Sequence, residues 1–216
     1  RRRSHCSARD GRLRHDQRCH DHVHDTLLGH VEFAGRAGRE IDDAAVVQLY
    51  ADGFHALPLA EKVLVWHLYQ AALAGRDIYY DQRYRHNLAM RAVLEAVLRH
   101  PDGIEPDVLA EITRYTKLFW LNTGPYNNLT ARKYLLNLDR QRLIEAAEIA
   151  QINGARLDLA TGQRVADLVE RYARMFFDPD FEPMVTNKTP GKGQDILASS
   201  ANNLYDGVTM ADLDGF

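Results

Sequence analysis

The sequence has few cysteines, no long apolar run and little net charge. Its 2 cysteines, Cys6 and Cys19, both lie near the N-terminus and say little about the redox compartment. No apolar run approaches the roughly 18 residues of a transmembrane helix, so we predict no membrane span. A net charge of −3 gives no electrostatic reason to expect binding to nucleic acid or to an anionic membrane.

Signatures of self-sufficient catalysis are also absent. No serine lies in a Gly-x-Ser-x-Gly elbow, and no dinucleotide-binding fingerprint occurs. Gly191-Lys192-Gly193 resembles a phosphate loop in composition only, because a P-loop needs Gly-x-x-x-x-Gly-Lys followed by Ser or Thr, directly after a strand. We interpret the proline-rich region 178–194, which contains these residues, as a surface loop.

The first forty residues differ in composition from the rest. They hold 9 Arg, no Lys and 6 of the 10 His, with almost no apolar periodicity. We expect residues 1–40 to be a disordered tail, or an artefact of a wrong start or reading frame. A metal site formed by Cys19, His20, His24 and Asp25 is the alternative, which would make the chain a small metalloprotein, but no hydrophobic frame fixes such a site.

From residue 41 to 216 the apolar pattern is that of helices, so we predict a mainly α fold with little β structure. The spacing of apolar residues, together with Pro and Gly at the ends, predicts the individual helices. The expected helices cover 42–52, 59–73, 87–99, 106 up to the stop at Gly124-Pro125, 140–152 and 162–178.

The expected helix 59–73 has an unusual distribution of apolar residues. Its large apolar side chains occupy most of the helix circumference, so we expect burial on several sides, with His67 as a core or boundary residue. The segment 76–82 that follows is polar and aromatic, and we predict an ordered corner there. Asp77 and Asp81 are expected to pair with nearby arginines such as Arg76.

The segment 114–134 joins two expected helices through Gly124-Pro125. It carries Tyr126, Asn127 and Asn128 in a turn-rich stretch, where rigid scaffolds often present side chains to ligands. The alternative is an ordered connection in which the Asn side chains satisfy their own backbone.

Three blocks of this sequence, in this order, carry a resemblance to a known family. The first runs from Leu57-Pro-Leu-Ala-Glu-Lys62 through 67–78 to Tyr80-Asp-Gln82. The second is 122–137, with Gly124, Tyr126, Asn127 and Lys133, and the third is 199–210, with Asn203 before Gly-Val-Thr. Together they are similar to the N-terminal part of dipeptidyl peptidase III-like zinc exopeptidases.

The resemblance implies a two-lobed metallopeptidase that releases dipeptides from peptide N-termini. In that family a His-Glu-x-x-Gly-His helix holds zinc, and no His-Glu dipeptide occurs in this chain. We therefore expect a helical N-terminal lobe with no catalytic residues, no metal site and no zinc of its own, inactive without a C-terminal catalytic lobe as partner. Candidate residues for peptide substrate or lobe contact are Tyr126, Asn127, Asn128 and Asn203.

A stand-alone, non-catalytic helical interaction module is the second hypothesis. Thr209-Met-Ala-Asp212 has the spacing of a capping box, which predicts the start of a helix and leads us to expect that the lobe is incomplete at this end. The sequence favours a cytoplasmic location, with export left open because the true N-terminus is uncertain. Peptide specificity and oligomeric state stay open.

Overall fold

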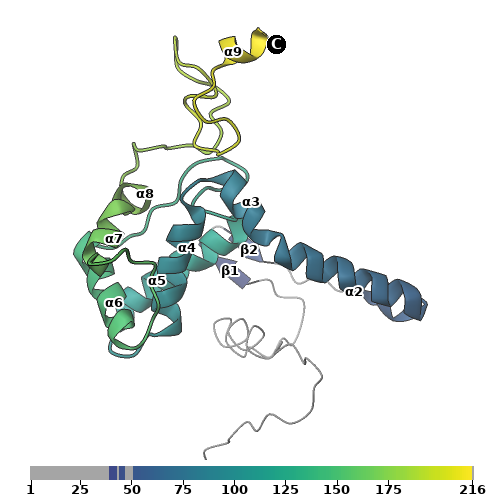
Figure 1. The fold of residues 1–216 in the computed structure, drawn as a ribbon, viewed down its shortest axis with the longest axis horizontal. Helices are drawn as coiled ribbons and strands as arrows, with labels where there is room; N and C mark the ends of the chain where they lie inside the picture. Colours follow the sequence, from purple (N-terminus) through teal and green to yellow (C-terminus); the bar gives the residue numbers. More distant parts are fainter. Residues whose placement is uncertain (1–38, 43, 47–50, 216) are drawn as a thin grey trace, which may run out of the picture. The chain divides into compact units, whose positions relative to one another are not determined.

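The computed structural model describes residues 39–42, 44–46 and 51–215, which all belong to one unit, Gly38–Phe216. The described part is mainly helical, as predicted, with one short hairpin (Figure 1). In chain order the elements are β1 Arg39–Ile41, β2 Ala44–Val46, η1 Asp52–Ala56, α2 Leu59–Ala74, α3 Arg76–Arg83, α4 Asn87–Arg99, α5 Pro106–Asn122, α6 Arg140–Ile152, α7 Val165–Arg171, α8 Ala173–Phe177 and α9 Met210–Asp214.

The hairpin replaces the first expected helix. β1 and β2 pair antiparallel with Arg39 opposite Val46, so the prediction of a helix over 42–52 is wrong at residues 44–46, while 43 and 47–50 lie outside the described residues. Asp42 turns the chain with a φ of 53° and forms an ion pair with Arg114 of α5. A tertiary contact therefore fixes a turn where the local sequence pattern indicated a helix.

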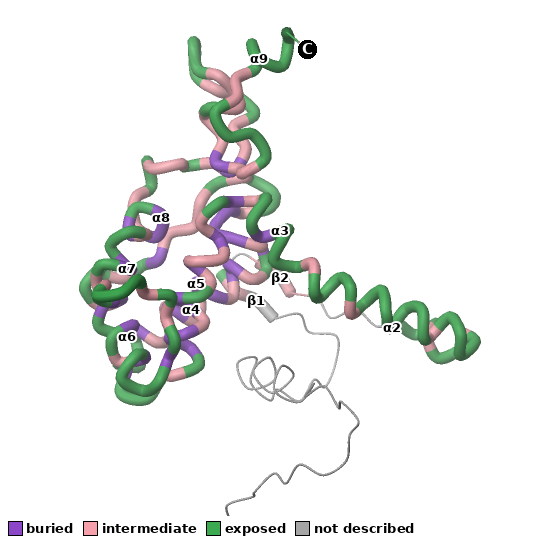
Figure 2. Tube along the Cα trace, viewed as in Figure 1, coloured by how far each residue is buried: buried purple, intermediate pink, exposed green. Residues whose placement is uncertain are grey.

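The core lies among α4, α5, α6 and α7. Helix α4 contacts both α5 and α6, and α6 contacts α7, so purple buried positions gather on these helices in Figure 2. The bounds of α4 and α6 agree with the prediction. The expected inward residues are buried, among them Leu94, Ile112 and Leu143, each 0% exposed. Pro106 stands at the first turn of α5, where its missing N–H costs no hydrogen bond.

The last expected helix of this bundle is shorter than predicted. It begins at Val165, with Arg164 as N-cap, and it breaks at Tyr172 between α7 and α8. The amide of Ala160 donates to the side chain of Gln163, which holds 160–163 in a turn and displaces Thr161 as the cap. The apolar stripe itself is confirmed, since Val165, Leu168, Val169 and Met175 are buried.

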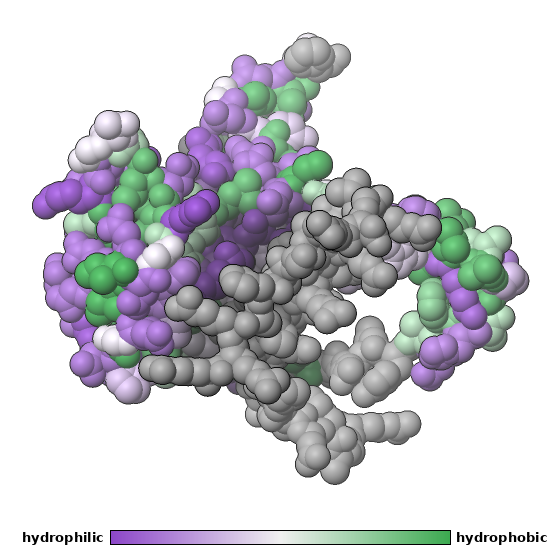
Figure 3. Space-filling view, turned by 60° about the horizontal axis from the view of Figure 1, so that its bottom comes forward, coloured by the Kyte–Doolittle hydropathy of each residue, from purple (hydrophilic) through white to green (hydrophobic). Residues whose placement is uncertain are grey.

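Helix α2 ends where the sequence indicated, at Gly75, but it is not buried. None of its residues is buried, and Figure 2 shows it green along most of its length. Of the described elements, α3 is the one that α2 contacts most. The expectation of burial on several sides is therefore wrong for the described residues, because none of them covers the apolar faces that the space-filling view shows along α2 (Figure 3).

The segment after Gly75 is a helix rather than a corner. In α3, Tyr80 faces the core and stacks on Phe119 of α5 with ring centroids 6.1 Å apart. The predicted pairing of Asp77 with Arg76 is present at 3.8 Å, although Arg91 of α4 lies closer, at 2.8 Å. That contact to α4 fixes the segment in helical form against the bundle.

Residues 178–194 form turns and bends with one isolated bridge at Met184, as expected for this loop, and 195–209 also lie outside any helix or strand. At its end the predicted capping box is confirmed. The Thr209 hydroxyl accepts from the amide of Asp212, whose carboxylate accepts from the amide of Thr209, and α9 follows. Within residues 39–42, 44–46 and 51–215, no helix combines the length and the apolar character needed to span a bilayer.

Candidate functional site

The C-terminus of α5 leads into the loop that the sequence singled out. Thr123 and Gly124 both have positive φ, 53° and 134°, and the amide of Gly124 donates to the carbonyl of Phe119 at 2.8 Å. The helix thus ends with Thr123 in the left-handed conformation, followed by Gly124, whose φ of 134° is one that residues with a Cβ rarely adopt. The Asn122 carboxamide then accepts from the amide of Asn128 at 2.9 Å and folds the loop back onto the helix.

Tyr126 is fully buried beneath this loop. Its hydroxyl donates to the main-chain carbonyl of Glu182 at 2.8 Å, and its ring meets Tyr84 edge to face at 5.2 Å. Burial raises the pKa of the Tyr126 hydroxyl above its ordinary range, so the group remains a proton donor. Tyr126 therefore holds the 181–185 segment against the bundle and does not itself reach the surface.

Asn127 and Asn128 have different roles. The Asn127 carboxamide oxygen accepts from the amides of Leu129 and Thr130 at 2.8 and 2.9 Å, and its nitrogen donates to the Tyr134 hydroxyl. The alternative that Asn satisfies its own backbone is thus confirmed for Asn127. Asn128 is exposed, and its carboxamide makes one long contact, 3.5 Å, to the carbonyl of Leu121. It is the freer of the two side chains.

Asn203 comes from a distant part of the chain and caps α3. Its amide donates to the carbonyl of Gln82 at 3.0 Å, and its side-chain nitrogen lies 3.3 Å from the carbonyl of Asp81. Arg83, the next residue of α3, donates to the carbonyl of Tyr126 at 3.3 Å. The structure therefore brings Asn203 and Tyr126 to the same end of α3.

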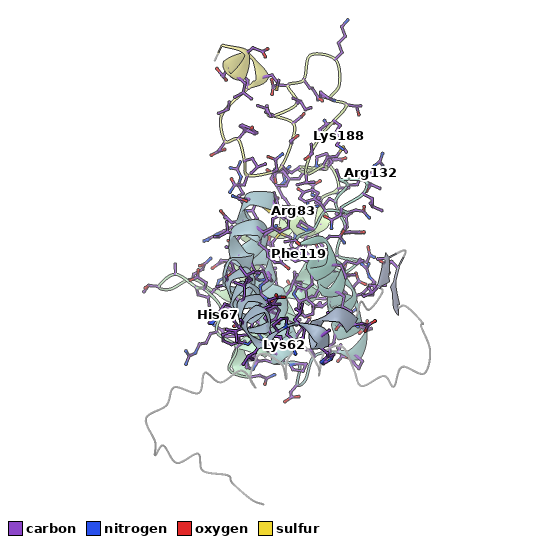
Figure 4. The ribbon with its side chains drawn as sticks, turned by 90° about the vertical axis from the view of Figure 1, so that its right-hand side faces the viewer. Lys62, His67, Arg83, Phe119, Arg132 and Lys188 are labelled. Atoms are coloured by element: carbon purple, nitrogen blue, oxygen red, sulfur yellow. The ribbon has the colours of Figure 1, made fainter. Side chains whose placement is uncertain are left out.

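Main-chain hydrogen bonds join three loops into what we call the loop platform, residues 126–134, 181–187 and 199–203. Lys133 donates its amide to Pro183, and Val185 donates to Ala131, each at 3.0 Å. Ala201 then donates to Met184 at 3.1 Å. In Figure 4, Arg83 lies at the end of α3 between the core residue Phe119 and the loop that carries Arg132.

Lys133 and Glu182 are the charged groups held inside the loop platform. The Lys133 ammonium donates to the carbonyl of Phe181, and burial lowers its pKa. Glu182 has a φ of 46°, and its carboxylate accepts from the Tyr84 hydroxyl. The sequence reasoning missed Tyr84 and Glu182, because they lie 98 residues apart and no local pattern links them.

The zinc ion that the resemblance implies is expected outside this chain, and that expectation stays a prediction. In the part of the chain that the structure describes, no three His, Cys, Asp or Glu side chains come close enough together to hold a metal ion. The polar side chains of the loop platform are amides, hydroxyls, the cations Arg132 and Lys133, and one carboxylate, and this set does not fit a zinc centre. The hypothetical site at Cys19, His20, His24 and Asp25 lies outside the described residues.

What the arrangement can do follows from its donors and acceptors. Asn128 and Arg132 are exposed, and they sit on main chain fixed by the contacts above. Carboxamides offer both a donor and an acceptor, which match the C=O and N–H groups of a peptide main chain. The loop platform therefore presents exposed hydrogen-bond donors and acceptors on a fixed main chain.

Comparison with known proteins gives no family assignment: no protein-family model matches the chain, and neither does any curated protein.

Proposed function

We propose that this chain forms the N-terminal helical lobe of a two-lobed zinc exopeptidase of the dipeptidyl peptidase III-like kind. In this proposal the loop platform forms part of the peptide-binding wall, and a C-terminal catalytic lobe holds the zinc ion. The ordered blocks at 57–82, 122–137 and 199–210 support the family. The exposure of α2 is the observation that supports a second folded part, because its apolar side chains lack cover.

The exposed residues of α2 point in too many directions for one flat surface to cover them. Leu64, Val65 and Trp66 follow one another at about 100° per residue around the helix. Their exposed fractions are 57%, 41% and 49%. A helix that is apolar all round is stable in water when other elements surround it. A second folded body with an apolar groove therefore fits α2 better than a single peptide or a membrane surface.

This apolar surface continues from α2 into α3. Leu68 and Leu73 are exposed on α2, and Ile78 and Tyr79 are exposed on α3, at 60%, 44%, 65% and 56%. Contiguous apolar surface of this kind marks an interaction site in a folded protein. We assign this surface to contact with the catalytic lobe, and the loop platform to contact with peptide.

The test compares the chain alone with a polypeptide that extends into the adjoining coding sequence. We expect the purified 216-residue chain to bind no stoichiometric zinc and to hydrolyse no dipeptidyl arylamide. We expect the extended polypeptide to contain a His-Glu-x-x-Gly-His segment, to bind one zinc ion and to release dipeptides until a chelator is added. Chelator-sensitive turnover by the pure chain alone would refute the proposal, as would an extension without that segment.

The second candidate is a stand-alone helical interaction module, for which we expect no large exposed apolar patch, so the exposure of α2 counts against it. In that case the adjoining DNA would contain a stop codon directly after Phe216. The chain would also melt cooperatively and stay monomeric at high concentration, whereas a separated lobe with a bare interface would associate. Sedimentation velocity over a hundredfold range of concentration distinguishes the two candidates.

A further inference from the structure

A hollow of about 430 Å³ lies between α4 and the turn that follows α6. Its charged and polar wall is formed by Arg91, Glu95, Arg99 and His100 of the α4 segment and by Arg156 beyond Gly154. Gly154 has a φ of 99°, and a Cβ built on it would have no atom within 4 Å, so the wall is open there. A volume of this size is suited to a small molecule.

Positive charge exceeds negative charge in this wall. Three arginines face one carboxylate, Glu95, although the whole chain carries a net charge of −3. Glu95 is already shared, because it accepts from Arg99 at 2.7 Å and from the Trp120 indole at 3.2 Å, with Arg91 at 3.7 Å. Asp77, which lies outside this wall, pairs with Arg91 at 2.8 Å, so Glu95 and Asp77 together leave an excess of one positive charge at the hollow.

Two of the donors have no described partner. Among residues 39–42, 44–46 and 51–215, no hydrogen bond or ion pair is made by the Arg156 guanidinium or by the His100 ring. Two side chains of α3 hold Arg91: its guanidinium lies 4.5 Å from the centroid of the Tyr80 ring and 2.8 Å from the Asp77 carboxylate. The wall thus combines arginines held in place by other side chains with two hydrogen-bond donors, one of them a guanidinium, that have no described partner.

We propose that this hollow binds a small oxyanion with two or more negative charges, either a phosphate or a polycarboxylate. Guanidinium groups donate two parallel N–H bonds to such oxygens, and a histidine ring adds a third donor. Arg156 and His100 supply the free donors, and Arg99 supplies further charge at the rim. The proposal does not depend on the peptidase assignment, because it uses neither the loop platform nor α2.

The experiment is calorimetric titration of the full chain with inorganic phosphate, with citrate and with chloride at constant ionic strength. We expect saturable binding of one phosphate or citrate and none of chloride. The double variant His100→Gln/Arg156→Gln should bind at least about tenfold more weakly, because the guanidinium charge of Arg156 and the ring donor of His100 are lost. Stronger binding of phosphate would indicate a phosphorylated ligand, and stronger binding of citrate a polycarboxylate.

The control removes the same residue types elsewhere. His55→Gln/Arg140→Gln changes the net charge equally but lies outside the wall of the hollow, so its affinity should equal that of the unmodified chain. Far-UV circular dichroism verifies that both variants are folded. The proposal is overturned if no saturable binding occurs at millimolar ligand, or if the control variant weakens binding as much as the hollow variant does.

Discussion

Gly124 lies directly against the side chain of Asn87. A Cβ built on Gly124 would come within 2.7 Å of both the nitrogen and the oxygen of the Asn87 carboxamide. Asn87 is fully buried, and its nitrogen donates to the carbonyls of Tyr80 and Thr123 at 2.8 and 3.1 Å. One amide at the start of α4 thereby ties the ends of α3 and α5 together and leaves room for glycine alone at position 124.

Gly124→Ala should destabilise the fold by about 3 kcal/mol or more. Part of this is the cost of a non-glycine residue at positive φ, about 1–2 kcal/mol, and the rest is the overlap with Asn87. The measurement is urea unfolding followed by circular dichroism. Gly154→Ala is the matched control, since its φ is 99° but no atom lies near the added Cβ, and it should cost only about 1–2 kcal/mol. Equal losses in the two variants would contradict the steric role of Asn87.

Tyr84→Phe should lower the free energy of unfolding by about 1.5–3 kcal/mol, because it removes a donor to the Glu182 carboxylate in a buried setting. Tyr115→Phe is the control. The Tyr115 hydroxyl is buried without a hydrogen-bond partner among the described residues, so its removal should be neutral or slightly stabilising. Thermal and urea unfolding of both variants measure the difference. A larger loss for Tyr115→Phe than for Tyr84→Phe would show that the Glu182 contact contributes little.

Trp66→Glu should leave the stability of the isolated chain within about 0.5 kcal/mol, since the side chain is 49% exposed. The same change should reduce concentration-dependent association and the binding of an apolar dye, because α2 carries the bare apolar surface. Leu94→Ala, at a fully buried position of α4, should instead cost about 2–5 kcal/mol. If Trp66→Glu unfolds the chain, α2 is part of the core and the proposed contact surface is wrong.

Stability should fall as the pH drops through the range in which His86 titrates. Burial lowers the pKa of His86, with Arg85 acting in the same direction and Glu182 against it, while Tyr84 and Tyr172 pack on the ring. In the unfolded chain the pKa is about 6.5, so below that pH the unfolded state binds more protons than the folded state. The contribution of His86 is therefore complete above about pH 6.5 and is lost as the pH falls to the lower folded-state pKa.

The measurement is the free energy of unfolding from pH 5 to 7.5 for the unmodified chain and for His86→Gln. In the variant, the free energy of unfolding should no longer show the fall between pH 7.5 and pH 5 that His86 causes. An unchanged pH profile in the variant would assign the decline to other groups.

The local pattern of the sequence was sufficient for the helices whose apolar stripe faces the core. The bounds of α4 and α6 follow from the spacing of residues such as Leu94 and Leu143 and from the turns after them. The loop after Gly124 was also recognisable, because Gly and Asn have direct backbone roles there. The family, the zinc-free expectation and the peptide-binding role of the loop platform remain predictions.

The sequence by itself determined the helical class, the end of α2 at Gly75, the start of α5 at Pro106 and the capping box at Thr209. These features depend on backbone chemistry within a few residues. The tertiary structure decided what joins distant segments: the ion pair of Asp42 with Arg114 and the hydrogen bond of Tyr84 to Glu182. It also decided that α2 stays exposed, since periodicity shows which faces of a helix are apolar but not which part of the protein covers them.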